Sequence, residues 1–194
     1  PLKQQKKATE TLILYAPIAH QLGLYRLKSE LEDLSLRYTN PEAYRLITNK
    51  LKSTANDRSK LIKEFLKPIE AELTKRRFKY YVKSRTKSVY SIRTKTQKQQ
   101  VDFVGVYDVF ATRIILDTAL DKEKDTCWEV FSIITSSYKQ NTERTRDWIT
   151  VPKANGYESL HTTVDTPDGK TIEVQIRTAR MDEIAEKGVA AHWR

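Results

Sequence analysis

Val104-Gly-Val-Tyr-Asp-Val-Phe-Ala-Thr-Arg-Ile-Ile-Leu116 is a nearly continuous apolar run. Such a run is typical of a strand buried on both faces of a sheet. Ser159–Asp165 and Thr171–Arg177 also have strand character, and Pro167-Asp-Gly169 between them is a strong turn signal. The other elements predicted around them are two short strands, a helix and a closing helix: Phe78–Val82, Trp148–Val151, Trp128–Tyr138 and a segment from about Met181.

Upstream of residue 75 the apolar residues follow helical spacing. A helix start is predicted at Asn40-Pro41, a break at 53–57, and a further helix around Leu61–Leu73. Helices first and strands afterwards predict an α+β fold, with a mixed sheet flanked by helices and preceded by a helical linker region. We assign residues 1–74 to that linker region, as a support and not a site, and residues 75–194 to the sheet domain.

Composition narrows the classes of function. With 194 residues, of which 39% are hydrophobic, the chain is long enough for a real core, and no run approaches a membrane span. A single cysteine, Cys127, excludes a disulfide framework and favours a reducing, cytoplasmic setting. The three histidines His20, His161 and His192 are scattered without ligand spacing, which argues against zinc.

The net charge of +10 comes from one segment. Residues 75–98 hold ten lysines and arginines and no acid, while the other 25 basic residues are balanced by 25 acidic ones. A concentrated charge of this kind indicates a localised site for a polyanion.

Phosphate binding is one interpretation of the basic segment. If a helix starts after Lys87, then Lys87, Ser91 and Lys95 share one face, and the backbone N–H groups of its N-terminus favour phosphate. Arg85, just before them, has a planar guanidinium that can stack on a base. The alternative is a solvated basic face.

Two carboxylates lie on predicted strands. Asp108 sits inside the apolar run, where it needs a salt bridge, for example to Arg113, or a metal. Glu173, Gln175 and Arg177 alternate along a strand and so project from one face, as they also would on a solvent-facing strand. Two acids beside a basic phosphate cradle are what Mg²⁺-assisted phosphoryl chemistry requires.

The stretch Lys153-Ala-Asn155-Gly-Tyr157-Glu-Ser-Leu-His161 gathers charged, amide and aromatic groups in nine residues. Asn-Gly marks a turn, so the stretch reads either as a plain loop entering a strand or as part of a nucleotide pocket. In the second interpretation Tyr157 is a stacking platform, and Lys153 and His161 contact phosphate.

Together these motifs resemble the synthetase domain of RelA/SpoT-type (p)ppGpp synthetases. The matching blocks, in order, are Arg85-x-Lys87-x-x-Tyr-Ser91-Ile-x-x-Lys95, Tyr107-Asp108-Val-x-Ala-x-Arg113, Pro152-Lys153-x-Asn155-Gly-Tyr157-x-Ser-x-His161, Glu173-x-Gln175-Ile-Arg177-Thr and Gly188-Val-Ala-Ala-His192-Trp. Upstream, Tyr15-Ala-Pro-x-Ala-His20 and Glu30-Leu-Glu-Asp33-Leu resemble that family's junction between hydrolase and synthetase domains.

The resemblance implies a nucleotidyltransferase-like fold and a Mg²⁺-dependent pyrophosphokinase, which transfers pyrophosphate from ATP to the 3′-hydroxyl of GDP or GTP. Residue by residue it implies that Arg85 stacks on adenine, that Lys87, Ser91 and Lys95 hold the ATP phosphates, and that Asp108 and Glu173 bind the metal. Glu173 would alternatively be the general base. Tyr157 would stack on guanine, with Lys153, Asn155, His161 and Arg146 around the acceptor nucleotide and with Gln175, Arg113 and Arg177 in support.

Two departures from the family pattern matter. Ser84 stands where the family usually has glycine. Arg146 takes the lysine position of an Arg-x-Lys-Asp block, which is the version found in bifunctional members. We therefore expect a longer bifunctional parent that supplies a hydrolase domain and C-terminal regulatory domains. Contact with a ribosome would come only through that parent, and no membrane contact is expected.

Two other functions remain open. One is a non-catalytic RNA-binding module that uses residues 75–98. The other is a regulatory pseudo-synthetase that binds nucleotide without turning it over.

Overall fold

The structure is a computed structural model that describes residues 2–99 and 110–188. Residues 2–75 form helices joined by short turns, as the apolar spacing predicts. They are α1 (Leu2–Glu10), a π-helical turn (Thr11–Tyr15), α2 (Ala16–Gln21), α3 (Tyr25–Thr39), α4 (Pro41–Ser53) and α5 (Ala55–Lys75). Asn40 caps α4 as expected, because its Oδ1 accepts the N–H of Ala43 at 3.0 Å. The predicted break at 53–57 is a single residue, Thr54.

The strands form one mixed sheet, which confirms the predicted α+β class. Its order is β1-β2-β5-β4-β3, and β2 and β5 pair in parallel while the other neighbours are antiparallel. The strand bounds are β1 Tyr80–Thr86, β2 Phe110–Leu116, β3 Lys139–Asp147, β4 Leu160–Asp165 and β5 Thr171–Thr178. The described residues also form α6 (Val89–Gln99), α7 (Glu123–Ser137) and α8 (Ala179–Lys187), with a 3-10 turn at Leu120–Lys122.

Two strand predictions were wrong in position. Residues 148–151 form a turn and not a strand, because the Asp147 carboxylate accepts the N–H groups of Ile149 and Thr150 at 3.0 and 2.8 Å. The edge strand β3 precedes that turn and was not predicted. β1 begins and ends later than the predicted Phe78–Val82. The part of the apolar run before Phe110 lies outside the described residues.

One face of the sheet carries the apolar core. Ile114, Leu160, Val174 and Ile176 are fully buried there, against α5 and α7. α5 precedes the boundary that we place at residue 75, yet it shares this core with the strands. The boundary itself stays a prediction.

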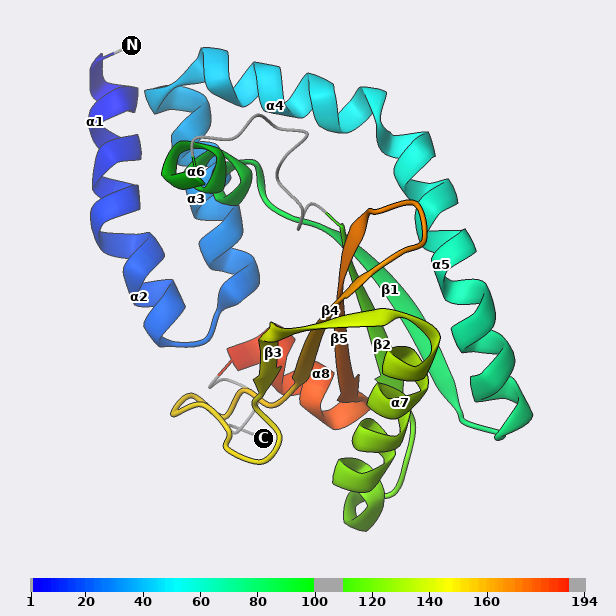
Figure 1. The fold of residues 1–194 in the computed structure, drawn as a ribbon. Coiled ribbons are helices and arrows are strands. Elements are labelled where there is room, and N and C mark those ends of the chain that lie inside the picture. Colours follow the sequence, from blue (N-terminus) through cyan, green and yellow to red (C-terminus); the bar gives the residue numbers. More distant parts are fainter. Residues whose placement is uncertain (1, 100–109, 189–194) are drawn as a thin grey trace.

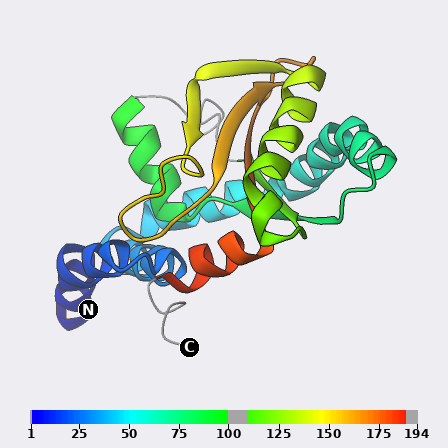
Figure 2. The ribbon, with the colours of Figure 1, turned by 90° about the horizontal axis from the view of Figure 1, so that it is seen from below.

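Helices α1, α2 and α3 lie on the other side of the sheet from α5 and α7 (Figures 1 and 2). The turn between α2 and α3 packs tightly against the end of α8. Gly23 and Gly188 both have positive φ, +70° and +61°, and a Cβ on Gly188 would stand 2.6 Å from the carbonyl oxygen of Leu22. Only glycine fits there, and this close approach brings α3 over the polar face of the sheet. Within residues 2–99 and 110–188, no helix is long and apolar enough to cross a membrane.

Candidate functional site

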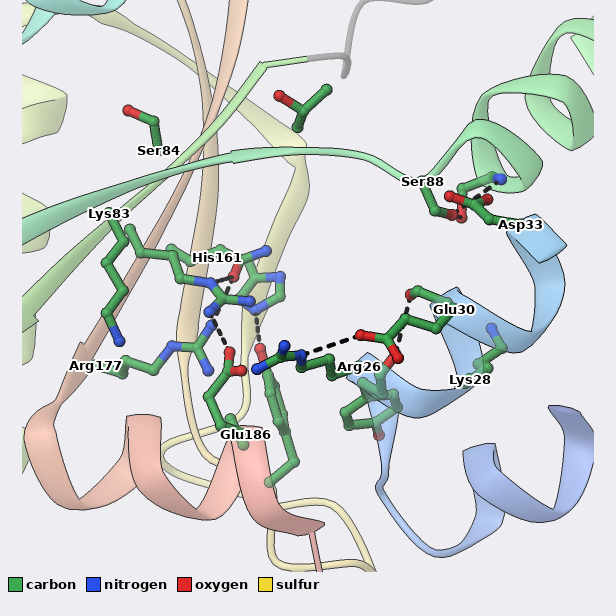
Figure 3. A pocket seen from close by; sticks show the side chains of 18 of the residues that line it. Arg26, Lys28, Glu30, Asp33, Lys83, Ser84, Ser88, His161, Arg177 and Glu186 are labelled. Carbon is green, nitrogen blue, oxygen red and sulfur yellow. Dashed lines mark hydrogen bonds and ion pairs between the residues drawn. The ribbon is translucent and has the colours of Figure 1, made fainter. Parts of the chain in front are cut away.

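A cavity of about 1030 Å³ opens between α3 and the polar face of the sheet. Figure 3 shows its two walls, with Arg26, Glu30 and Asp33 on α3 facing His161 and Arg177 on the strands. Of the sequence-predicted site residues, seven line it: Ser91, Arg113, Lys153, Tyr157, His161, Gln175 and Arg177. The structure therefore brings residues from four separate motif blocks to one cavity.

Gln175 is the centre of the polar network on β5. Its Oε1 accepts hydrogen bonds from Arg113 Nε at 3.2 Å and from Arg177 Nη2 at 2.7 Å. Its Nε2 donates to Glu173 Oε1 at 2.8 Å. The alternation predicted from sequence is present. Val174 and Ile176 point into the apolar core, and the other three side chains of the strand, those of Glu173, Gln175 and Arg177, share the opposite face.

Glu173 is held as a carboxylate between a cation and an amide. Lys87 Nζ lies 3.1 Å from its Oε2, and His161 Nδ1 lies 4.0 Å from its Oε1. Burial alone would raise the pKa of Glu173, but the Lys87 ammonium and the hydrogen bond from Gln175 outweigh it. The pKa therefore lies below its ordinary value, and the group is ionised at neutral pH.

His161 is neutral at physiological pH. Burial lowers its pKa to about 4, although the Glu173 carboxylate opposes that shift. Its Nε2 lies 2.7 Å from the hydroxyl oxygen of Tyr157. Burial also raises the pKa of Tyr157, so the hydroxyl keeps its proton and can donate it to a His161 ring that is protonated at Nδ1.

The ring of Tyr157 is enclosed by neighbours, with only 8% of the residue exposed. Lys153 Nζ and Arg177 Cζ lie 5.1 and 5.5 Å from the ring centroid, within cation–π range. Tyr25 of α3 packs against it edge to face, with the centroids 5.8 Å apart. A base could stack on this ring only if one of these neighbours moved, and the stacking role stays a prediction.

Asp182 and Glu186 of α8, together with Glu173 of β5, balance part of the positive charge around the cavity. Lys83 Nζ pairs with Asp182 at 2.7 Å, and Arg113 Nη1 pairs with Glu186 at 2.6 Å. Arg177 is 1% exposed, and its Nε and Nη1 have no hydrogen-bond partner in the described structure, with the nearest carboxylate oxygen, on Asp182, 3.7 Å away. Buried donors of this kind are normally satisfied, and here the Asp182 carboxylate offsets the charge from ion-pair distance without a hydrogen bond.

The predicted helix after Lys87 is α6, but its first N–H groups are already bonded. Val89 and Tyr90 donate to the Asp33 carboxylate of α3, and Ser91 donates to Ser88 Oγ at 3.2 Å. The expectation that these amides bind phosphate therefore does not hold in this structure. The side chains of Lys87, Ser91 and Lys95 are still carried by this segment, and Ser91 lines the cavity.

The remaining predicted residues are not gathered at the cavity. Asn155 lies in the loop before β4 and donates to Tyr25 Oη at 2.8 Å. Arg146 Nη1 donates to carbonyl oxygens of its own strand, those of Glu143 and Thr145. Asp108 and the side chain of Arg85 lie outside the described residues.

Residues of α3 were missed by the sequence reasoning, which took this region for a support. Tyr25, Ser29 and Asp33 line the cavity, and they recur at four-residue steps, so they share one helix face. This row of polar residues on an amphipathic helix was the sequence signal that α3 has a second, polar face. Lys83, which had no predicted role, is also in the lining.

A mixed sheet with a large cavity on its polar face, lined by lysines and arginines, defines an α+β domain suited to binding a polyphosphate. A family described as a region found in RelA / SpoT proteins matches residues 84–194. This chain belongs to the RelA/SpoT family.

Relatives match over the whole chain. It is 42% identical over 193 residues to a guanosine-3′,5′-bis(diphosphate) 3′-pyrophosphohydrolase of Vibrio cholerae, covering 100% of this chain and 27% of that protein. It is 40% identical to the bifunctional (p)ppGpp synthase/hydrolase SpoT of Escherichia coli, with the same coverage. A GTP pyrophosphokinase of Myxococcus xanthus is 42% identical, covering 99% and 25%. The chain thus spans about a quarter of the length of these curated relatives.

Solved structures share the fold. A GTP pyrophosphokinase family protein from Streptococcus pneumoniae is 26% identical with a TM-score of 0.50, covering 71% of this chain and 72% of that one. The small alarmone synthetase 1 of Bacillus subtilis is 21% identical with a TM-score of 0.51, covering 71% and 75%. At that identity the second likeness concerns the fold alone.

Proposed function

We propose that this chain is the (p)ppGpp-synthesising part of a longer RelA/SpoT protein and transfers pyrophosphate from ATP to the 3′-hydroxyl of GDP or GTP. The observation that carries the proposal is that the α6 segment, the Lys153–His161 loop and the strand of Glu173 meet at one cavity. At about 1030 Å³ the cavity is at the upper end of small-molecule sites, which suits two nucleotides better than one. The names of the Myxococcus and Escherichia coli relatives, a GTP pyrophosphokinase and a bifunctional (p)ppGpp synthase/hydrolase, support the same reaction.

In this proposal the ATP side is formed by the α6 segment and the acceptor side by the Lys153–His161 loop. Lys87, Ser91 and Lys95 hold the phosphates of ATP, and Arg85 stacks on adenine. Lys153, Asn155, Tyr157, His161 and Arg146 bind the guanine nucleotide. Such a division suits phosphoryl transfer, because most of its rate comes from positioning and from neutralising charge.

Glu173 is the proposed general base. Its lowered pKa keeps the carboxylate ionised, and the hydrogen bond from Gln175 fixes its orientation. It accepts the proton of the 3′-hydroxyl as that oxygen bonds to the β-phosphorus of ATP. The bond between the β-phosphorus and the oxygen that bridges it to the α-phosphorus breaks, and AMP leaves.

Mg²⁺ is part of the proposal, and the residues present are compatible with it. Magnesium commonly takes one or two carboxylates together with phosphate oxygens of the substrate. Glu173 offers carboxylate oxygens next to Gln175 of the cavity lining, whereas no group of three His, Cys, Asp or Glu side chains within residues 2–99 and 110–188 is arranged to hold a metal ion by itself. Asp108 would hold the ion, which would offset negative charge on the transferred phosphates; Glu173 would join it there in the alternative to the base role.

The test is product analysis of the chain with ATP, GDP and Mg²⁺, using chromatography that separates AMP and ppGpp. We expect both products in equal amounts from the wild type, and a loss of at least 100-fold in rate for Glu173→Gln. Glu72→Gln, which removes a partly exposed carboxylate on α5 that pairs with Arg76, is the matched control and should keep the wild-type rate.

Two results would contradict the proposal. One is calorimetry in which the wild type binds neither ATP nor GDP. The other is a Glu173→Gln variant that synthesises ppGpp at the wild-type rate. If both nucleotides bind and no product forms, the regulatory pseudo-synthetase replaces the enzyme.

A further inference from the structure

Helix α3 is bonded to both nucleotide-binding segments of the proposed enzyme. At its C-terminal half, Asp33 Oδ1 accepts the N–H of Tyr90 at 2.8 Å, and Oδ2 accepts the N–H of Val89 at 3.2 Å. These bonds join positions more than fifty residues apart in the chain. Figure 3 shows Asp33 reaching from α3 to the start of α6 beside Ser88.

Two side chains, Ser88 and Asp33, cap the start of α6 and accept the N–H groups of its first turn. Ser88 satisfies the N–H of Ser91 from within the segment, as an ordinary N-cap does. The N–H groups of Val89 and Tyr90 depend on Asp33 of another element. A carboxylate that accepts two N–H groups at a helix N-terminus is also favoured by the helix dipole. The first turn of α6, which carries Ser91, is therefore fixed in place by α3.

At the other end of the helix, Tyr25 holds the loop proposed for the acceptor nucleotide. Its hydroxyl oxygen accepts a hydrogen bond from Asn155 Nδ2 at 2.8 Å, and its ring packs edge to face on Tyr157. Asn155 Oδ1 in turn accepts the N–H of Tyr157 at 3.3 Å, so the contact reaches the backbone of the loop.

The two contacts are rigidly related because one helix carries both. Tyr25 and Asp33 are eight residues apart in an unbroken helix, which corresponds to about 12 Å along its axis. The chemistry needs the 3′-hydroxyl of one nucleotide to meet the β-phosphorus of the other at about 3 Å. A fixed spacer between the two halves of the site meets that need.

We propose that α3 positions both half-sites, with Asp33 setting the ATP-binding helix α6 and Tyr25 setting the acceptor loop at Asn155. This inference rests on the proposed function and adds two positioning residues to it. Neither residue is assigned a reacting atom, and each acts through the segment that it holds.

The experiment measures binding of a non-hydrolysable ATP analogue and of GDP separately, by calorimetry with Mg²⁺ present. We expect Asp33→Ala to weaken the ATP analogue at least fivefold and to leave GDP unchanged. We expect Tyr25→Phe, which removes only the hydroxyl, to weaken GDP at least threefold and to leave the ATP analogue unchanged. Asp33→Asn, whose amide oxygen can still accept an N–H, should lie between wild type and Asp33→Ala.

Matched controls lose the same kind of bond away from the cavity. Asn40→Ala removes the N-cap of α4, and Tyr138→Phe removes a hydroxyl that donates to the Phe65 carbonyl oxygen at 2.8 Å. Both should bind the two ligands like wild type. Circular dichroism at the assay temperature checks that every variant is folded, and Asp33→Asn carries the test if Asp33→Ala is not.

The pattern of the two ligands decides the outcome. If each variant weakens both ligands equally, α3 is only a structural support and the inference fails. If an Asp33 variant binds the ATP analogue more tightly, its carboxylate competes with phosphate, and the inference also fails. A wild type that binds neither nucleotide contradicts the proposed function instead, so the two failures are distinguishable.

Discussion

The two faces of the central sheet use the same strands for opposite purposes. Along β5, Ile172, Val174 and Ile176 are completely buried in the apolar core, while Glu173, Gln175 and Arg177 alternate with them on the cavity side. Burial of apolar side chains stabilises the fold on one face. On the polar face each charge loses hydration, and only an ion pair or hydrogen bond offsets that cost. Stability is therefore concentrated on one face and the proposed chemistry on the other.

The sharpest test of this comparison removes volume from the apolar face. Ile176→Ala deletes a fully buried side chain beneath the polar network and should lower the free energy of unfolding by about 2 to 5 kcal/mol. Ile13→Ala makes the same change at a residue that is 66% exposed, and should cost less than about 1 kcal/mol. Urea denaturation measures both, and equal losses at the two sites would contradict the assignment of the core to this face.

A pH titration tests the polar face. The pKa of His161 is lowered from 6.5 to about 4, so the unfolded chain binds a proton there more readily than the folded one. Stability is then complete above pH 6.5 and falls as the pH drops toward 4. Between pH 7 and pH 5 the loss should be about 2 kcal/mol.

The control for that titration is His161→Asn, which cannot titrate. It should remove most of the loss between pH 7 and pH 5, when unfolding by urea is followed at both values. The pKa of the Glu173 carboxylate is also lowered, so this group reduces stability only when the pH falls below the ordinary pKa of a glutamate. It therefore contributes little to the change between pH 7 and pH 5. A variant with the full wild-type dependence would show that His161 is not the group responsible.

The smallest effect is expected at the mouth of the cavity. Arg26 and Glu30 form an ion pair at 3.2 Å, with 78% and 58% of their side chains exposed. Arg26→Ala should change the free energy of unfolding by less than about 0.5 kcal/mol, because water screens such pairs. Thermal unfolding at low salt checks this, and a loss as large as that of Ile176→Ala would contradict the view that stability is concentrated on the apolar face.

Sequence patterns predicted the apolar face better than the polar one, for a physical reason. Burial imposes a period on the chain, so the helices around Leu61–Leu73 and the strand Thr171–Arg177 were visible from spacing alone. The edge strand β3 buries little, as its mostly charged and polar residues show, and it left no such period. Ile149 is buried but lies in a turn, which is why its neighbourhood was mistaken for a strand.

The site was predictable in its parts and not in its assembly. The residues on β5 and in the Lys153–His161 loop followed from motif and alternation. The four-residue spacing of Tyr25, Ser29 and Asp33 indicates a polar face on α3, but it does not say which element that face meets. Contacts such as Asp33 to Tyr90 depend on where two distant elements pack, and neither segment's spacing reports that.

The parallel pairing of β2 with β5 also has a kinetic consequence. Arg113 lies opposite Gln175 in that register, and 62 residues separate the two. Contacts of such high sequence separation form late and slowly in folding, because a long loop must close first. The polar network that joins Arg113, Gln175 and Glu173 therefore exists only once β2 and β5 have paired. A nascent or partly unfolded chain would have the motifs but not the pocket, and capacity to bind nucleotide should appear in the last phase of refolding.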